Sequence, residues 1–180
     1  MPSALIVVDV QKGFDEPEWG RRNNPACEAN VAGLIERWRI KGWPVVYVRH
    51  DSVVPGSSLA PGRPGNDFKA ELVTVPDLIV SKHVNSAFLG TPDLDAWLHE
   101  HELQSVAICG ITTNHCCETT ARMAGNLGYG TTFVLDATYT FDRPDLEGRR
   151  ISADELARVT AANLQGEFAA VLSTHELLAG

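Results

Sequence analysis

Short apolar runs alternate along the chain with segments of helical periodicity, and this alternation constrains the fold more than any other feature. Six runs have the length and the β-branched or aliphatic composition of buried strands: 4–8, 45–48, 78–80, 106–109, 132–135 and 169–172. Apolar residues at helical spacing mark the intervening and following segments 27–38, 92–101, 114–127, 153–164 and 174–178. The pair Asn24-Pro25 is typical of an N-cap followed by proline in the first helical turn. This order of elements predicts a three-layer α/β fold, in which a doubly wound sheet of six mainly parallel strands carries helices on both faces.

Length and charge narrow the class of protein further. The chain has 180 residues, 44% hydrophobic and 21% charged, which predicts a single globular domain over residues 1–180. The formal net charge of −8 argues against a nucleic acid partner, because phosphate binding requires clustered Lys and Arg. No apolar stretch approaches the length of a membrane span, and the four cysteines have no zinc-site spacing. We expect a cytoplasmic protein with reduced thiols that acts on a small molecule without a cofactor.

A long irregular stretch, residues 51–67, follows the second apolar run and contains three prolines and three glycines. Irregular loops of this length are uncommon in compact domains unless they serve a function. The stretch leaves the carboxyl end of a strand, which is where ligands bind in open α/β sheets. We therefore expect it to cover or line the substrate pocket, with a plain surface excursion as the alternative.

Three polar residues follow or end apolar runs and suggest nucleophilic chemistry. Asp9 closes ALIVVD, Lys82 closes LIVSK, and Cys116 lies just beyond VAICGITT. A doubly wound sheet brings all three to its carboxyl edge, where an acid, a base and a thiol can act together. Each residue alone is weak evidence, because a strand-end Asp often caps a helix and a single Cys is usually part of the core.

Cys116 has a second argument in its favour. The segment 112–116 passes from strand to helix, and Thr113 or Asn114 can cap that helix. Unpaired N–H groups in a first helical turn lower the pKa of a thiol and can bind a developing oxyanion, so we expect a Cys116 thiolate. Cys117 lies on the apolar face of the same helix, and Cys27 and Cys109 lie in packing positions, so these three are expected to be structural.

The histidines offer an alternative to this arrangement. His50, His83 and His115 follow strands, but no pair among these three has a metal-ligand spacing, so we predict no metal site. A Cys–His dyad that uses His115 or His50 remains a second possibility. No G-x-G-x-x-G follows the first strand and no P-loop is present, which argues against nucleotide binding.

Four segments resemble a known family of enzymes. IVVDVQKGF at 6–14, KHVNSAFLGT at 82–91 and GITTNHCCETTARMA at 110–124 are similar to the signature segments of isochorismatase-like cysteine hydrolases. LDAT at 135–138 is similar to a fourth, weaker segment. The resemblance covers nearly the whole chain in the family's order. It implies a parallel sheet of strand order 3-2-1-4-5-6 and assembly as a homodimer or homotetramer.

The resemblance also assigns roles to residues. It implies that Asp9, Lys82 and Cys116 form the catalytic triad, since the family's nucleophile stands six positions after the glycine that is Gly110 here. It further implies a cis peptide between Ile111 and Thr112 and an oxyanion hole formed by the N–H groups of Thr112 and Cys116.

Two departures from the family pattern narrow the activity. Nicotinamidases of the family carry an Asp-x-His metal motif after the second strand, whereas this chain has Asp51-Ser52-Val53. A nicotinamidase activity and a bound zinc are therefore not expected. Isochorismatases proper lack the nucleophilic cysteine that this chain has at position 116, and they cleave a vinyl ether by acid catalysis.

These features together predict a cysteine-dependent hydrolase of a small amide, carbamoyl or ureido compound that forms a thioester intermediate. The alternatives are a vinyl ether hydrolase that uses Asp9 as its acid and a non-catalytic binding protein of the same fold. The residues expected to form the walls of the substrate pocket are Phe14, His50, Asn85, Phe88, Tyr139 and Phe141.

Overall fold

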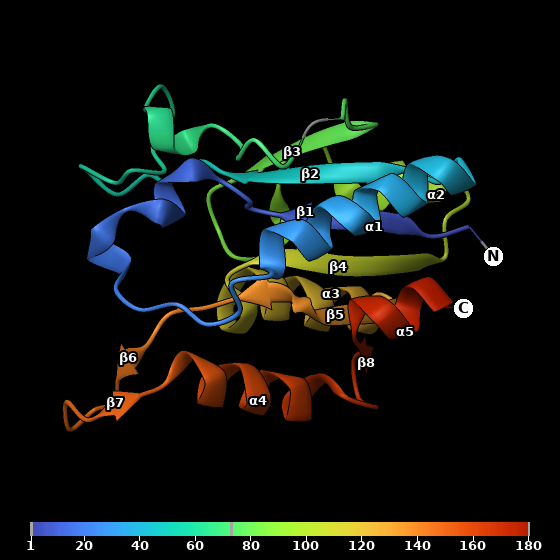
Figure 1. Ribbon diagram of the computed structural model, residues 1–180. Helices are drawn as coiled ribbons and strands as arrows, with labels where there is room; N and C mark the ends of the chain where they lie inside the picture. Colours follow the sequence, from blue (N-terminus) through green and yellow to red (C-terminus); the bar gives the residue numbers. More distant parts are fainter. Residues whose placement is uncertain (1, 73, 180) are drawn as a thin grey trace.

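A six-stranded parallel sheet forms the centre of the computed structural model, which describes residues 2–72 and 74–179 (Figure 1). The strand order is β3-β2-β1-β4-β5-β8, and every neighbouring pair runs parallel. The strands are β1 (Ala4–Val8), β2 (Val45–His50), β3 (Leu78–Lys82), β4 (Ser105–Ile111), β5 (Gly130–Tyr139) and β8 (Ala170–Leu172). The expected order 3-2-1-4-5-6 is confirmed, with β8 as the sixth strand of the sheet.

The sheet separates two hydrophobic cores because side chains alternate along each strand. In β1, Leu5 and Val7 face the core beneath α1 (Cys27–Lys41), where the α5 residues Leu177 and Leu178 also pack. Ala4, Ile6 and Val8 face the opposite core. That second core contains residues of α2 (Leu94–Glu100), α3 (Glu118–Asn126) and α4 (Ala153–Leu164), whereas α5 (Thr174–Ala179) lies near α1. This arrangement is the three-layer α/β fold that the sequence predicts.

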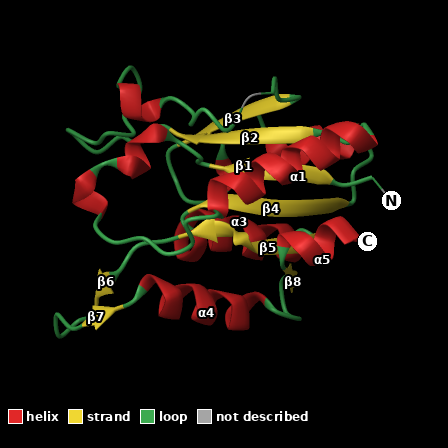
Figure 2. Cartoon of the chain, viewed as in Figure 1, coloured by secondary structure: helices red, strands yellow, loops and turns green. Residues whose placement is uncertain are grey.

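Irregular segments gather at the carboxyl edge of the sheet, on the left in Figure 2. They include the short 3-10 helices η1 (Lys12–Asp15), η2 (Pro17–Trp19) and η3 (Pro64–Asn66), with η4 (Ala87–Leu89) after β3. A two-stranded antiparallel hairpin, β6 (Arg143–Pro144) and β7 (Arg150–Ile151), also extends from this side (Figure 1). No helix among the described residues is long and apolar enough to cross a membrane.

Two local expectations differ from the structure, and one element was not expected. The N-cap of α1 is Ala26, and Asn24 instead uses its side chain to bind the backbone oxygens of Asp136 and Thr138. The helix expected from residue 114 begins with a π-helical turn (Thr113–Cys117) whose N-cap, Thr112, makes no side-chain capping bond. The β6–β7 hairpin was not expected, because its two-residue strands carry no apolar pattern.

Candidate active site

Asp9 is held at the carboxyl end of β1 by an unusual backbone conformation. Its φ angle is 51°, in the left-handed region, which Asp and Asn tolerate better than most residues. Beside it, Gly110 of β4 has a φ of 124°, and a Cβ atom there would lie 2.0 Å from the Val8 oxygen. Glycine at position 110 therefore allows the two central strands to approach where Asp9 leaves the sheet.

Lys82 lies at the centre of the site. Its Nζ atom is 2.6 Å from Asp9 Oδ2, 3.2 Å from His50 Nδ1 and 3.4 Å from Cys116 Sγ. Both Asp9 and Lys82 have fully buried side chains, although Lys82 starts two strands away from Asp9. Burial opposes a charge on Lys82, but attraction to Asp9 and Cys116 outweighs it and raises the pKa, so Lys82 remains an ammonium ion.

Cys116 lies in the π-helical turn that follows β4. Its Sγ atom contacts Lys82 and lies 3.8 Å from the Oδ1 atom of the exposed Asn85. The thiol thus faces the ammonium ion on one side and a polar, solvent-facing side chain on the other. Cys116 is 8% exposed, whereas Cys27, Cys109 and Cys117 are at most 1% exposed. As expected, the other three cysteines lie in the cores, and Cys117 has the packing position.

The expected low pKa of the Cys116 thiol is wrong. Burial and the nearby Asp9 carboxylate raise the pKa of Cys116, and the opposing effect of Lys82 does not offset them. The position of Cys116 in the first helical turn therefore does not determine the protonation state of its thiol. The physical reason is that a carboxylate in contact with a buried thiol disfavours a second negative charge. Cys116 is consequently a neutral thiol at pH 7 and requires a base to become a nucleophile.

Asp9 has the geometry of such a base. Its Oδ2 atom accepts the hydrogen bond from Lys82, while Oδ1 is buried and accepts no hydrogen bond from any residue that the structure describes. A carboxylate oxygen of Asp9, a ring nitrogen of His50 and Cys116 Sγ all lie within 4.8 Å of one another. A buried carboxylate oxygen without a partner is costly, so a proton from Cys116 has a favourable acceptor nearby.

His50 is fixed at the end of β2 by polar side chains that the sequence did not single out. Gln11 accepts a hydrogen bond from the His50 backbone N–H and donates one to its carbonyl oxygen. Asn66, from η3, donates to the same carbonyl oxygen and also receives a bond from Gln11 through its own backbone oxygen. Gln11 stands within the first family-like segment, but its contact with residue 66 depends on how the long loop folds back.

A metal ion does not fit the donor atoms of this site. The family's metal motif requires a histidine two residues after its aspartate, but this chain has Val53 two residues after Asp51. Asp51 Oδ1 also already accepts hydrogen bonds from Arg49 and Asn66. The alternative cluster of Asp9, His50 and Cys116 surrounds the Lys82 ammonium group, which already supplies a positive charge to the same atoms. A second cation among them would be repelled.

A hollow of about 590 Å³ opens beside His50. One wall comes from Glu16, Glu18 and Trp19, and the other comes from residues of the long loop after β2: Ser52, Val54, Pro55, Gly56, Ser57, Ser58 and Leu59. The first part of the stretch 51–67, as far as Leu59, thus lines a hollow, and its role as part of the substrate pocket stays a prediction.

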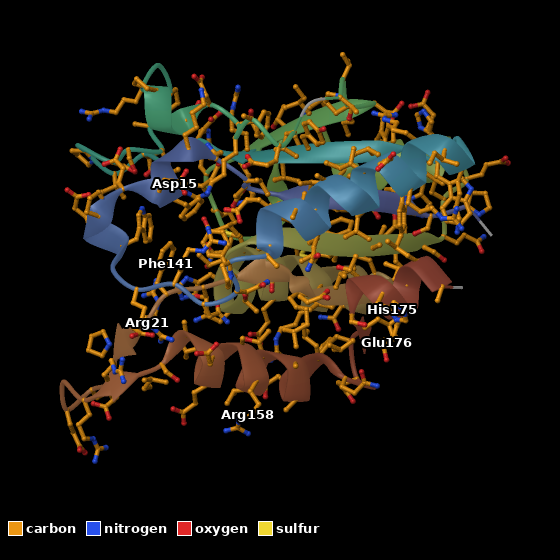
Figure 3. All side chains as sticks on the ribbon, viewed as in Figure 1. Asp15, Arg21, Phe141, Arg158, His175 and Glu176 are labelled. Carbon is orange, nitrogen blue, oxygen red and sulfur yellow. The ribbon has the colours of Figure 1, made fainter. Side chains whose placement is uncertain are left out.

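The six expected pocket residues occupy different environments. His50 lines the hollow, and Asn85 lies beside the thiol. The ring of Phe14 is tilted against Trp19 with its centroid 4.9 Å away, and Phe141 stacks on Trp19 at 5.3 Å, so both support the wall from behind. Figure 3 shows Phe141 near the carboxyl edge, below Asp15. The remaining two expected residues, Phe88 and Tyr139, are not part of the lining of this hollow.

Both of these side chains are packed. Phe88 lies in the second core and stacks on Tyr129, with ring centroids 5.8 Å apart. Tyr139 is fully buried, and its hydroxyl lies 3.3 Å from Lys69 Nζ. The sequence pattern favours both at the site because they follow or end strand-like segments, but the pattern does not determine which way each ring points.

His115 does not reach the thiol through the contacts that the structure shows. Its Nδ1 atom lies 3.4 Å from an Arg143 guanidinium nitrogen of the β6–β7 hairpin. Burial and the Arg143 charge lower the pKa of His115. The residue thus points toward the hairpin, whereas His50 is the histidine that contacts Lys82.

Comparison with known proteins identifies the group to which this arrangement is similar. A family model described as the Isochorismatase domain matches residues 3–176. The chain is 43% identical to the uncharacterised isochorismatase family protein YrdC of Bacillus subtilis (strain 168) over 177 residues, which cover 97% of this chain and 94% of the relative. It is 31% identical to Nicotinamidase 3 of Arabidopsis thaliana over 189 residues, covering 97% and 86%. The crystal structure of a cysteine hydrolase from Pseudomonas syringae pv. phaseolicola 1448A superposes with a TM-score of 0.86 at 29% identity, covering 98% and 91%.

Proposed function

Because the chain belongs to the isochorismatase family of hydrolases, we propose that it hydrolyses small amide, carbamoyl or ureido compounds through a thioester on Cys116. The observation that carries this proposal is that the two carboxylate oxygens of Asp9 have different surroundings. One of its oxygens is bound by the Lys82 ammonium at 2.6 Å, and the other, near a neutral thiol, has no hydrogen-bond partner among the residues that the structure describes. A structural ion pair has no need of a thiol within hydrogen-bond distance of its ammonium group.

In the first step, Asp9 accepts the proton of Cys116 as the sulfur attacks the carbonyl carbon. Transfer of this proton makes the carboxyl group neutral and the sulfur nucleophilic, so the site never holds two adjacent negative charges. Lys82 stays protonated throughout, and its Nζ atom, 3.4 Å from Sγ, stabilises the sulfur as charge develops on it.

The tetrahedral intermediate then requires donors for its oxyanion. We assign this role to the N–H groups of Thr112 and Cys116, which lie at the end of β4 and in the turn that follows. The peptide between Ile111 and Thr112 is cis in the structure, at the position that the family resemblance implies. Asp9 then returns its proton to the leaving nitrogen, and the C–N bond breaks to give the thioester.

Hydrolysis of the thioester uses the same groups in reverse order. Asp9, again a carboxylate, takes a proton from water that attacks the thioester, and the thiol of Cys116 regains a proton as it leaves. The amide substrate class is supported by Nicotinamidase 3, a relative named for an amide-hydrolysing activity. The incomplete metal motif at Asp51–Val53 separates this chain from a metal-assisted version of that reaction.

An activity screen tests the proposal. Purified protein is incubated with a panel of small amides, carbamoyl compounds and ureides, and released ammonia is measured, with Cys116→Ala and Cys117→Ala compared on each compound that reacts. We expect Cys116→Ala to abolish ammonia release. Cys117→Ala should retain it and lose stability instead, because it opens a small cavity in a core. Turnover that survives Cys116→Ala contradicts the proposal.

A further inference from the structure

His50 contacts Lys82 at the centre of the site and is also one of the residues that line the hollow. Its Nδ1 atom lies 3.2 Å from Lys82 Nζ, and the residue forms part of the lining of the 590 Å³ hollow. A ring nitrogen of His50 is also within 4.8 Å of Cys116 Sγ. A compound whose carbonyl group reaches the thiol therefore has its remaining atoms close to this imidazole ring.

The contact with Lys82 determines which nitrogen of His50 carries the proton. An ammonium group has three N–H donors and no acceptor, so Nδ1 must be the acceptor in this contact. A neutral imidazole that accepts at Nδ1 carries its proton at Nε2. None of the hydrogen bonds among the described residues uses the Nε2 atom of His50. The lysine thus turns His50 into a donor that has no partner among the residues that the structure describes.

The surrounding groups keep this ring neutral. Burial and the positive charge of Lys82 lower the pKa of His50, with a smaller contribution in the same direction from His83. Asp9 and Asp51 oppose this effect without reversing it. The backbone of His50 is held on both its N–H and its carbonyl group by Gln11. The donor is therefore fixed in position as well as in protonation state.

We propose that the hollow is the subsite for the uncleaved part of the substrate and that His50 Nε2–H recognises an uncharged hydrogen-bond acceptor there. A carbonyl oxygen or an aromatic ring nitrogen has this property. Trp19 supplies a flat wall that Phe14 and Phe141 hold from behind, so a planar ligand suits the hollow. Glu16 and Glu18, both exposed, lie on the same wall and disfavour a carboxylate ligand. This inference rests on the proposed function, since it names the substrate class of that site.

Histidine NMR tests the protonation state without any substrate. In protein labelled with ¹⁵N-histidine, long-range proton–nitrogen correlations distinguish the two neutral tautomers and the imidazolium form. The signals of His50 are those lost in His50→Asn. We expect a neutral ring with its proton on Nε2 at pH 7 and its titration below the ordinary histidine pKa of 6.5. A proton on Nδ1, or an imidazolium ring at pH 7, overturns the inference.

Ligand binding tests the recognition. The probes are benzamide and the three pyridinecarboxamides, which share one shape and place a ring nitrogen at each available position, with 3-carboxybenzamide as the anionic probe. Affinities are measured by calorimetry on Cys116→Ala, which cannot turn the probes over. We expect at least one pyridinecarboxamide to bind about three- to tenfold more tightly than benzamide, the usual value of one hydrogen bond. The anionic probe should bind more weakly than benzamide. Equal affinities for all probes, or no binding by any of them, overturn the inference.

Two substitutions of His50, each added to Cys116→Ala, separate its two contacts. His50→Asn keeps an oxygen near the Nδ1 position that can accept from Lys82, but its amide does not reach the hollow. His50→Gln places an amide donor at the depth of Nε2. We expect His50→Asn to remove the preference for the ring nitrogen and His50→Gln to retain most of it. The same loss in both variants would mean that His50 has only a structural role.

A matched control uses the exposed His175 of α5, which Figure 3 shows at the opposite edge of the molecule from Phe141. His175→Asn, added to Cys116→Ala, should bind every probe as Cys116→Ala alone does. Neither the NMR nor the binding measurement requires turnover. A failure of the proposed thioester chemistry is seen in the ammonia assay, whereas a failure of this inference is seen here, so the two are distinguishable.

Discussion

At the scale of single residues, the site depends on charges that neutralise one another in a buried space. Lys82 balances Asp9, and removal of either charge would leave the other buried and unpaired. The thiol of Cys116 stays neutral in this resting state because burial and the nearby Asp9 carboxylate both raise its pKa. The proximity of Asp9, Lys82 and Cys116 could be predicted from the sequence, since each lies at or after the carboxyl end of a strand. The direction in which the Cys116 pKa shifts could not be predicted, because it depends on a contact between side chains that are far apart in the sequence.

Asparagine at position 9 tests the role of the carboxylate as a base. Asp9→Asn suits the left-handed backbone at φ 51° and keeps the shape of the side chain. We expect the variant to fold with lower stability, because Lys82 loses its charged partner, and its amide turnover to fall by about 10²–10⁴, the usual contribution of a positioned acid–base group. The pKa of Cys116 should fall at the same time, because burial still raises it but the Asp9 charge no longer does, and Lys82, which lowers it, remains.

Thiolate absorbance near 240 nm, measured against pH as the difference between each protein and its Cys116→Ala counterpart, reports this pKa. A lower thiol pKa together with slower turnover shows that Asp9 moves protons rather than suppressing a reactive thiolate. Unchanged turnover would remove Asp9 from the mechanism. The loss should be smaller for an activated ester, whose leaving group needs no proton.

The predicted metal independence also depends on individual side chains. Val53 cannot serve as a ligand, and Lys82 occupies the centre of the Asp9, His50 and Cys116 cluster. We predict no stoichiometric transition metal by elemental analysis and unchanged ammonia release after dialysis against EDTA. About one metal ion per chain, with activity that EDTA removes and zinc restores, would contradict this prediction.

At the scale of secondary structure, the loop after β2 is held against the rest of the carboxyl edge by two lysines of different burial. Lys69 is buried and binds Asp15 of η1, with Glu28 of α1 at 2.8 Å. Lys12 of η1 binds Asp67 at 3.2 Å, with both side chains more than half exposed. These contacts join η1 and α1 to residues 67 and 69, which lie beyond the loop wall of the hollow in the sequence.

The strands and helices themselves could be predicted, because buried strands and amphipathic helices have distinct periodicities. The loop contacts could not, because they join residues 41 to 55 positions apart with no local pattern. Nor could the pocket walls be predicted fully. Tyr139 and Phe88 were expected there, whereas Trp19 was overlooked, since ring orientation depends on packing between elements.

The two lysines offer a matched pair of substitutions. Lys69→Met leaves Glu28 with Arg22 as its remaining partner, so we expect a loss of about 3 kcal/mol, the lower end for breaking a buried pair. Lys12→Met removes an exposed pair and should cost about 0–1 kcal/mol. Urea denaturation at pH 7 measures both. Similar small losses in the two variants would show that Lys69 does not anchor the loop.

At the scale of the whole molecule, two hydrophobic cores on either side of one sheet bury three structural thiols. Cys27 and Cys109 lie in the core beneath α1, and Cys117 lies in the opposite core. Burial raises the pKa of all three above the ordinary value of 9.0. The folded protein therefore keeps these thiols protonated at pH values where the unfolded chain loses the protons.

The sign of the resulting pH dependence follows from proton binding. Above pH 9 the unfolded state binds fewer protons than the folded state, so the free energy of unfolding falls as pH rises. Each thiol contributes a slope of up to about 1.4 kcal/mol per pH unit in this range. Urea denaturation between pH 8 and pH 10.5 should show the decline, and Cys109→Ala should make it less steep. A stability that stays constant or rises over this range would contradict the burial of neutral thiols.

The proposed chemistry as a whole depends on a covalent bond between Cys116 and the acyl part of the substrate. Its most direct test is acid quenching of the wild-type protein during turnover of an amide identified in the ammonia screen, followed by mass spectrometry of the intact protein and its peptides. Hydroxylamine, added in a parallel reaction, should intercept the same species as an acyl hydroxamate. We predict a mass increase equal to the acyl group on the peptide that contains Cys116, and none in Cys116→Ala. Ammonia release without an adduct on Cys116 and without hydroxamate, or an adduct on another residue, would contradict the thioester mechanism.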